Sequence, residues 1–123
     1  MGFTATDSRM VIVNVIEYPS VAVDSFNFPR SAVVGEWKPF SIKGKVTKAG
    51  AGKIAVGINN AVGSAGSIVI RYGGKEYTIR PNENFVSEDG GADYVGKTYE
   101  ISGSIKFTSS GEYTITIFAG YSI

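Results

Sequence analysis

Carboxylates are the residues of this sequence best suited to chemistry, because the chain contains no His and no Cys. The commonest general base and the thiolate nucleophile are therefore both excluded. Residues 81–96 carry four acidic side chains and no Lys or Arg: Glu83, Glu88, Asp89 and Asp93. A carboxylate pair can act as acid and base, and a cluster can bind calcium. The spacing fits no calcium-loop template, so the sequence favours a solvated loop, with a metal site at Glu88, Asp89 and Asp93 as the alternative.

The other sequence patterns of catalysis are missing as well. No Ser lies in a nucleophile-elbow or Ser-x-x-Lys context. Residues 57–66 are rich in Gly and Ala, but they lack the Gly-Lys-Ser/Thr ending of a phosphate-binding loop. We therefore expect no catalytic activity and no cofactor.

Aromatic side chains offer a second kind of site, because flat rings pack against sugar rings. The chain has one Trp and seven Tyr. Most of them fall on the core-facing side of a predicted strand, whereas Trp37, Tyr94 and Tyr18 do not. These three residues are the candidates for a carbohydrate-binding surface, which is the alternative to a function in protein–protein assembly.

The composition indicates an all-β protein of one domain. The 123 residues include thirteen Ile, thirteen Val and no Leu or Gln, and β-branched side chains suit a pleated surface. Low Gln and Cys content is also typical of thermophiles. The net charge is +1 with scattered Lys and Arg, which argues against nucleic acid as a partner. The start of the chain lacks the pattern of a secretion signal, and the apolar run at residues 10–16 is too short to span a bilayer.

Alternation of apolar and polar residues predicts eight strands separated by turn residues. We expect no helix longer than one turn, because no stretch has a sustained 3.6-residue period. Residues 81–96 are expected to form a long loop. The predicted strands are residues 9–18, 21–28, 40–48, 53–59, 67–72, 75–80, 99–107 and 113–121.

The sharpest local prediction is a hairpin around Gly73-Gly74. Two glycines supply the positive φ angles of a primed two-residue turn. The turn places Arg71 opposite Glu76, an opposite-charge pair, and Ile70 opposite Tyr77 on the buried face. A slip of one residue would lose both features, so turn and register support each other.

Two segments share the pattern aromatic-x-Ile-x-Gly-x-aliphatic, at residues 40–46 and 99–105. We expect these strands to be neighbours, with two inward glycines that admit a bulky side chain from the facing sheet. The segments resemble strands B and E of an immunoglobulin-like domain, and residues 110–115 resemble the start of strand F. In that resemblance Tyr113 is the corner tyrosine, and Ile115 stands where antibody domains have a cysteine.

The resemblance implies a single immunoglobulin-like antiparallel β-sandwich of 7–8 strands at residues 9–123, preceded by an arm at residues 1–8. Cysteine-free relatives of this type in bacteria, archaea and viruses are commonly adhesive or structural. The resemblance therefore implies a virion component, for capsid decoration or a tail, or a surface layer or filament, and a location on a virion or cell surface.

The terminal segments predict an assembly surface. Residues 10–16 are apolar on both faces, with Ile12 and Ile16 opposite the valines, and Phe118 lies opposite Ile115 and Ile117 in the last strand. A strand that is apolar on both sides needs a cover. Residues 1–8 or the loop at 57–66 are one candidate cover. We favour the other, in which Ile12, Ile16 and Phe118 contact another protein, either a second copy in a homo-oligomer or a larger particle.

Overall fold

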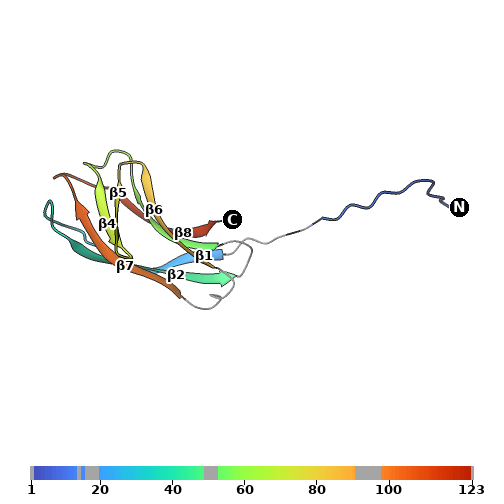
Figure 1. Ribbon diagram of the computed structural model, residues 1–123, viewed down its shortest axis with the longest axis horizontal. Coiled ribbons are helices and arrows are strands. Elements are labelled where there is room, and N and C mark those ends of the chain that lie inside the picture. The colour runs from blue at the N-terminus through green and yellow to red at the C-terminus, as the bar shows by residue number, and fades with distance from the viewer. Residues whose placement is uncertain (1, 14, 16–19, 49–52, 91–97, 123) are drawn as a thin grey trace.

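Eight strands form two antiparallel sheets that pack face to face (Figure 1). The computed structural model describes residues 2–13, 15, 20–48, 53–90 and 98–122. The five-stranded sheet has the order β1-β2-β7-β4-β5, and the three-stranded sheet has the order β6-β3-β8. The strands are β1 (Ser20–Asn27), β2 (Lys38–Lys48), β3 (Lys53–Asn60), β4 (Ile68–Tyr72), β5 (Lys75–Ile79), β6 (Glu83–Gly90), β7 (Thr98–Phe107) and β8 (Ile115–Ser122). The prediction of an all-β antiparallel sandwich is confirmed.

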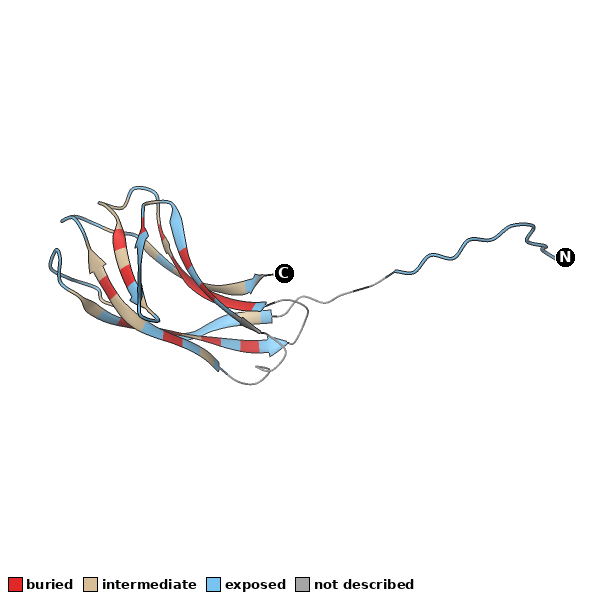
Figure 2. Cartoon of the chain, viewed as in Figure 1, coloured by how far each residue is buried: buried red, intermediate tan, exposed pale blue. Residues whose placement is uncertain are grey.

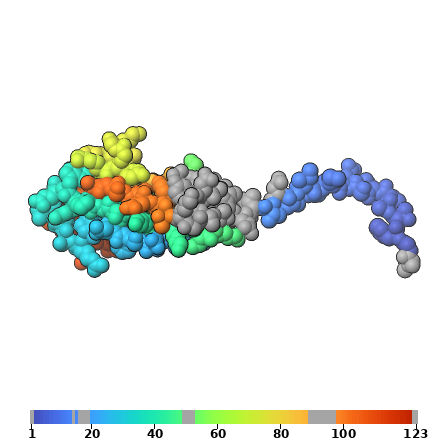
Figure 3. All heavy atoms as spheres, turned by 90° about the horizontal axis from the view of Figure 1, so that it is seen from below, coloured from blue at the N-terminus to red at the C-terminus, as the bar shows by residue number. Residues whose placement is uncertain are grey.

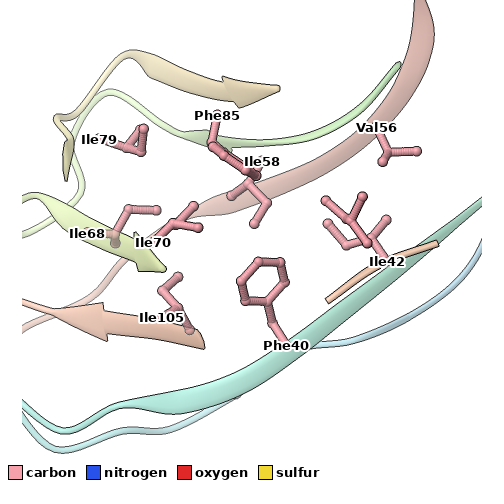
Figure 4. Close-up of a cluster of buried hydrophobic side chains, with 10 residues drawn as sticks. Phe40, Ile42, Val56, Ile58, Ile68, Ile70, Ile79, Phe85 and Ile105 are labelled. Carbon is pink, nitrogen blue, oxygen red and sulfur yellow. The ribbon is translucent and has the colours of Figure 1, made fainter. Parts of the chain in front are cut away.

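The core lies between the central strands of the two sheets. Ile and Val side chains alternate inward along β2, β3, β4 and β7, and their burial excludes water from both inner faces. Figure 4 shows Phe40, Ile42 and Ile105 of one sheet pointing toward Val56 and Ile58 of the other. The core residues that are 2% exposed or less are Phe40, Ile42, Val46, Ile54, Val56, Ile58, Ile68, Ile70, Ile101 and Ile105.

The predicted hairpin is confirmed in turn and register. Gly73 and Gly74 have φ angles of 61° and 77°, and Arg71 pairs with Glu76 across β4 and β5. The Arg71 Nη2 atom lies 2.8 Å from Glu76 Oε1. Ile70 is fully buried, while Tyr77 on the same face stays 38% exposed.

The strands with the shared glycine pattern are neighbours, as predicted. In the β2–β7 ladder Gly44 lies opposite Tyr99, and Gly103 lies opposite Phe40. The antiparallel register therefore places each glycine beside the aromatic residue of the other strand rather than at the same depth. A Cβ atom on Gly44 would lie 2.7 Å from Val56 Cγ1, so this glycine does admit a side chain from the facing sheet.

Two predicted elements are wrong. Residues 9–13 and 15 lie outside any strand, because they extend away from the sandwich (Figure 1) and an extended segment on its own does not form a stable strand. Residues 83–90, predicted to be part of a loop, form β6, which pairs with β3. The sequence signal of β6 is weak because Phe85 and Ser87 are its only buried side chains among those described, and its acidic residues suit a solvated edge strand.

Candidate functional site

On one side of the sandwich the sheets end in β1 and β8, each of which has a single neighbouring strand in the described part of the chain. Among the described residues β1 pairs with β2 alone, and β8 pairs with β3 alone. The two edge strands contact each other across the sandwich. A free edge presents unpaired N–H and C=O groups, which is the usual starting point for pairing with another chain.

The inner face of β1 is apolar along its whole length. Val21 and Val23 lie opposite Val46 and Gly44, and the register then shifts between Val23 and Ser25. This bulge moves Phe26 onto the same face, opposite Ile42. Val21, Val23 and Phe26 therefore share one face, although two of these positions are odd-numbered and one is even-numbered. Phe28 follows them, and its ring lies 6.3 Å from that of Phe40.

This inner face of β1 is open to water. Val23 is 37% exposed and Phe26 is 57% exposed, although both side chains point in the direction of the facing sheet. Figure 2 shows β1 as largely exposed beside the buried stretches of β2. The three-stranded sheet stops at β8 and does not reach far enough to cover these side chains.

The inner face of β8 is half-covered for the same reason. Ile117 lies opposite Ile58, and Ala119 lies opposite Val56. Ile58 and Val56 in the central strand β3 are fully buried, whereas Ile115, Ile117 and Ala119 in β8 are only partly buried. Similar side chains thus differ in burial because β3 has a neighbour on both sides and β8 has one among the described residues.

A groove of about 890 Å³ lies at one end of the sandwich, where the end of β1, the start of β8 and the segments at 28–34 and 107–113 line it. Arg30 and Glu112 are its charged lining residues, and most of the others are apolar or small. The apolar lining comprises Phe26, Phe28, Pro29, Ala32, Val34, Phe107, Tyr113, Ile115 and Ile117. The groove is therefore suited to an extended apolar segment with backbone groups that can pair with an edge.

Tyr113 holds one end of the groove in shape. The Ser109 N–H donates a hydrogen bond to the Tyr113 hydroxyl at 3.1 Å, and the hydroxyl donates to the Ser109 carbonyl at 3.1 Å. The ring of Tyr113 packs edge-on against Phe107 at a centroid distance of 4.9 Å. Both contacts hold the chain that leads into β8, so this wall of the groove exists before anything binds.

The arm that precedes β1 carries a second exposed apolar surface. Residues 2–13 extend away from the sandwich (Figures 1 and 3). The large apolar side chains described before β1 have exposed fractions of 72% or more: Phe3, Met10, Val11, Ile12, Val13 and Val15. Monomeric proteins rarely leave so many apolar side chains in a row in water.

The predicted interface residues are not brought together within one chain. Ile12 is 81% exposed in the arm, and Ile16 lies outside the described residues. Phe118 lies on the outer face of β8, where its ring covers Gly57; a Cβ atom there would be 2.5 Å from Phe118 Cζ. Neither of the two suggested covers lies over this surface. Residues 2–8 are exposed. The loop after β3 instead contacts the chain before β8, where the Ala65 N–H donates a hydrogen bond to the Glu112 carbonyl. The sequence does not reveal that Val23 and Phe26 share a face with Phe28, because the bulge breaks their alternation.

The structure does not bring the candidate sugar-binding and metal-binding residues together into a site. Trp37 is half-buried, with the Arg71 guanidinium 4.0 Å and the Lys106 ammonium 4.8 Å from its ring centroid, so cations already stack on it. Tyr18 and Tyr94 lie outside the described residues, as does Asp93. Glu88 is exposed, Asp89 lies in β6, and the described residues contain no group of three acidic side chains placed to hold a metal ion.

The ion pairs between described residues lie on the surface, where their side chains are exposed. The hydrogen bond from Arg71 lowers the pKa of Glu76, and Lys43 lies 3.8 Å from Glu100. No helix in the described part of the chain is long and apolar enough to cross a membrane.

Comparison with known proteins yields no match among the family models, the curated proteins or the solved structures.

Proposed function

We propose that this chain is a non-enzymatic structural subunit that assembles with copies of itself through protein–protein contacts. The observation that carries the proposal is the uncovered inner face of β1, where Val23 and Phe26 remain 37% and 57% exposed. A strand face that points toward the opposite sheet is normally covered. Here it is exposed beside the unpaired edge of β8. This combination is expected of a sandwich that a partner completes.

The burial of apolar surface favours the binding of another chain over the inner face of β1. Fully burying a side chain such as Val or Phe stabilises by about 1.5–3 kcal/mol. The exposed parts of Val23 and Phe26, together with apolar residues of the arm, therefore supply a driving force that can exceed the cost of association. The edge backbone of β8 adds hydrogen bonds that fix orientation.

An immunoglobulin-like type of sandwich is part of this proposal. It is supported by the pairing of β2 with β7 and by the hydrogen bonds from Tyr113 back to Ser109, which is the bonding of a corner tyrosine. Domains of this type serve in virion decoration, tails, surface layers and filaments, and these are the settings we propose.

Light scattering over a concentration series tests the proposal. The expected result is a mass that rises above the 13.1 kDa of one chain as concentration increases. Phe26→Ser should shift the rise to higher concentration. Val62→Ser is the matched control, because Val62 is 74% exposed but does not line the groove. A mass that stays at one chain over the whole series contradicts the proposal.

A further inference from the structure

We infer that residues 9–15 of one copy add a strand to the free edge of β8 of a neighbouring copy and fill its groove. The inference deepens the proposed function and rests on it, because it names the segment and the edge through which copies assemble. β-strand addition is a common mode of recognition, in which backbone bonds give affinity and alternate side chains give specificity.

The donor and the acceptor match in length. β8 has eight residues and the run from Arg9 to Val15 has seven. At about 3.3 Å per residue these correspond to about 26 Å and 23 Å. One donated strand therefore spans nearly the whole edge of β8.

The side chains of the donor fit the groove in one of the two possible orientations. Val11, Val13 and Val15 alternate onto one face of an extended strand, and all three are apolar and β-branched. The opposite face contains Met10 and Ile12 but also Asn14, whose amide would lose its hydrogen bonds to water in an apolar groove. The valines therefore face inward.

The inward valines meet the side chains that the isolated chain leaves exposed. A strand beside β8 lies across β1, so it covers Val23 and Phe26. Its outward face carries Ile12 on the same side of the sheet as Phe118. This arrangement brings together the two interface residues that lie apart within a single chain.

The direction of the strands favours a second copy over the chain's own arm. Ser20 lies opposite Lys48, and Lys53, a few residues further along the chain, lies opposite Ser122. The start of β1 and the end of β8 are therefore at one end of the sandwich (Figure 1). An arm that folded back to pair with the edge of its own β8 would run parallel to that strand, whereas every ladder between described strands is antiparallel. A neighbour's arm can enter antiparallel, which is the more stable pairing.

Such a contact is head-to-tail, because the arm of one copy and the groove of the next are different surfaces. A head-to-tail contact that does not close into a ring generates an open chain of subunits. Each subunit in this chain has one donor and one acceptor.

Three variants of the full chain test the inference. V11D/V13D charges the donated face, F26D charges the groove, and T4D/T6D places the same charge in the arm outside residues 9–15. The substituted side chains of the first two variants are exposed in the single chain, and a far-UV spectrum equal to that of the unmodified chain checks that each is folded. V23D, which charges the exposed inner face of β1 beside the groove, serves as an additional acceptor variant.

The expected result has two parts. V11D/V13D and F26D each stay at the mass of one chain to at least about a hundredfold above the concentration at which the unmodified chain associates, while T4D/T6D associates normally. An equimolar mixture of V11D/V13D and F26D forms a complex of twice the chain mass, because one retains an intact groove and the other an intact arm.

Other outcomes separate the two proposals. Association of V11D/V13D at the same concentration as the unmodified chain overturns strand donation and leaves the proposed assembly in place through another surface. A mixture that forms no complex also overturns donation. An unmodified chain that never associates overturns both, and protection of residues 9–15 from hydrogen exchange in that chain would place the arm in its own groove.

Discussion

The two sides of the sandwich carry similar side chains but bury them to different extents. On the side of β5 and β6, the ring of Phe85 lies 5.7 Å from Tyr72 and 5.3 Å from Tyr77, and Phe85 is 5% exposed. On the side of β1 and β8, Phe26 also points toward the facing sheet and remains 57% exposed. We call these the closed side and the open side.

The closed side also has polar contacts between the sheets. The Ser87 hydroxyl lies 2.7 Å from the Tyr99 hydroxyl and donates to that of Tyr72 at 3.4 Å. The difference between the sides shows that burial depends on whether the facing sheet reaches a strand. An inward-facing apolar residue at an uncovered edge is consequently a marker of a missing partner.

Replacing one Phe on each side should give the largest contrast. Phe85→Ala leaves a cavity in the core, and we expect a loss of about 3–5 kcal/mol in the free energy of unfolding. Phe26→Ala should cost less than about 1 kcal/mol in the single chain, because most of its ring is already in water. Urea unfolding in the V11D/V13D background measures both without assembly, and equal losses for the two variants would remove the distinction between the sides.

Gly57 in the central strand β3 and Gly120 in the edge strand β8 differ in the space around their Cα atoms. A Cβ atom on Gly57 of β3 would clash with the Phe85 carbonyl and the Phe118 ring, whereas one on Gly120 of β8 would meet nothing within 4 Å. Gly57→Ala should cost about 1–3 kcal/mol, and Gly120→Ala should be neutral or slightly stabilising. Thermal and urea unfolding of the two variants check the difference, and a destabilised Gly120→Ala variant would mean that β8 is more tightly covered than described.

Removing the Tyr113 hydroxyl should weaken one wall of the groove on the open side. Tyr113→Phe loses both hydrogen bonds to Ser109, and we expect a loss of about 0.5–1.5 kcal/mol together with weaker assembly, since the groove wall loosens. Tyr77→Phe on the closed side is the control, because the Tyr77 hydroxyl makes no hydrogen bond to the described residues. Unfolding and light scattering measure the two effects, and equal behaviour of the variants would contradict a role for the Tyr113 contact.

The smallest effect is expected at the exposed pair on the hairpin of the closed side. The pKa of Glu76 is lowered by its hydrogen bond from Arg71, so the pair stabilises the fold fully above the pKa of Glu76 in the unfolded chain. That contribution disappears as the pH falls through the lowered pKa of the folded state. Arg71→Gln should return the pKa of Glu76 toward its ordinary range, as measured by NMR titration of its carboxyl group. Global stability at neutral pH should barely change, because exposed ion pairs contribute little.

Strands of the core could be predicted from sequence because their pattern is regular. Residues of β4, β5 and β7 alternate without interruption, and Gly73-Gly74 leaves one register between Arg71 and Glu76. In these elements local preference and tertiary packing point the same way.

The facing of β1, the strand β6 and the arm were harder to predict, because something outside the local pattern determines them. The bulge in β1 moves Phe26 to the face of Val23, and no spacing rule places such a bulge. In β6 the single buried Phe and its acidic neighbours resemble a loop until the pairing with β3 is known. The apolar run of the arm was predicted as a strand, but its described residues extend away from the sandwich (Figure 1) and lie outside any strand.

The exposed arm also has a consequence for solubility. A short run of β-branched residues with no Pro and no net charge is the sequence type that forms cross-β aggregates, and residues 10–16 are of this type. Arg9 and Glu17 flank the run in the way that charged gatekeepers border unavoidable apolar strands. The chain therefore carries an amyloid-prone segment, and in the proposed assembly the neighbour that takes up this segment would also protect the protein from aggregation.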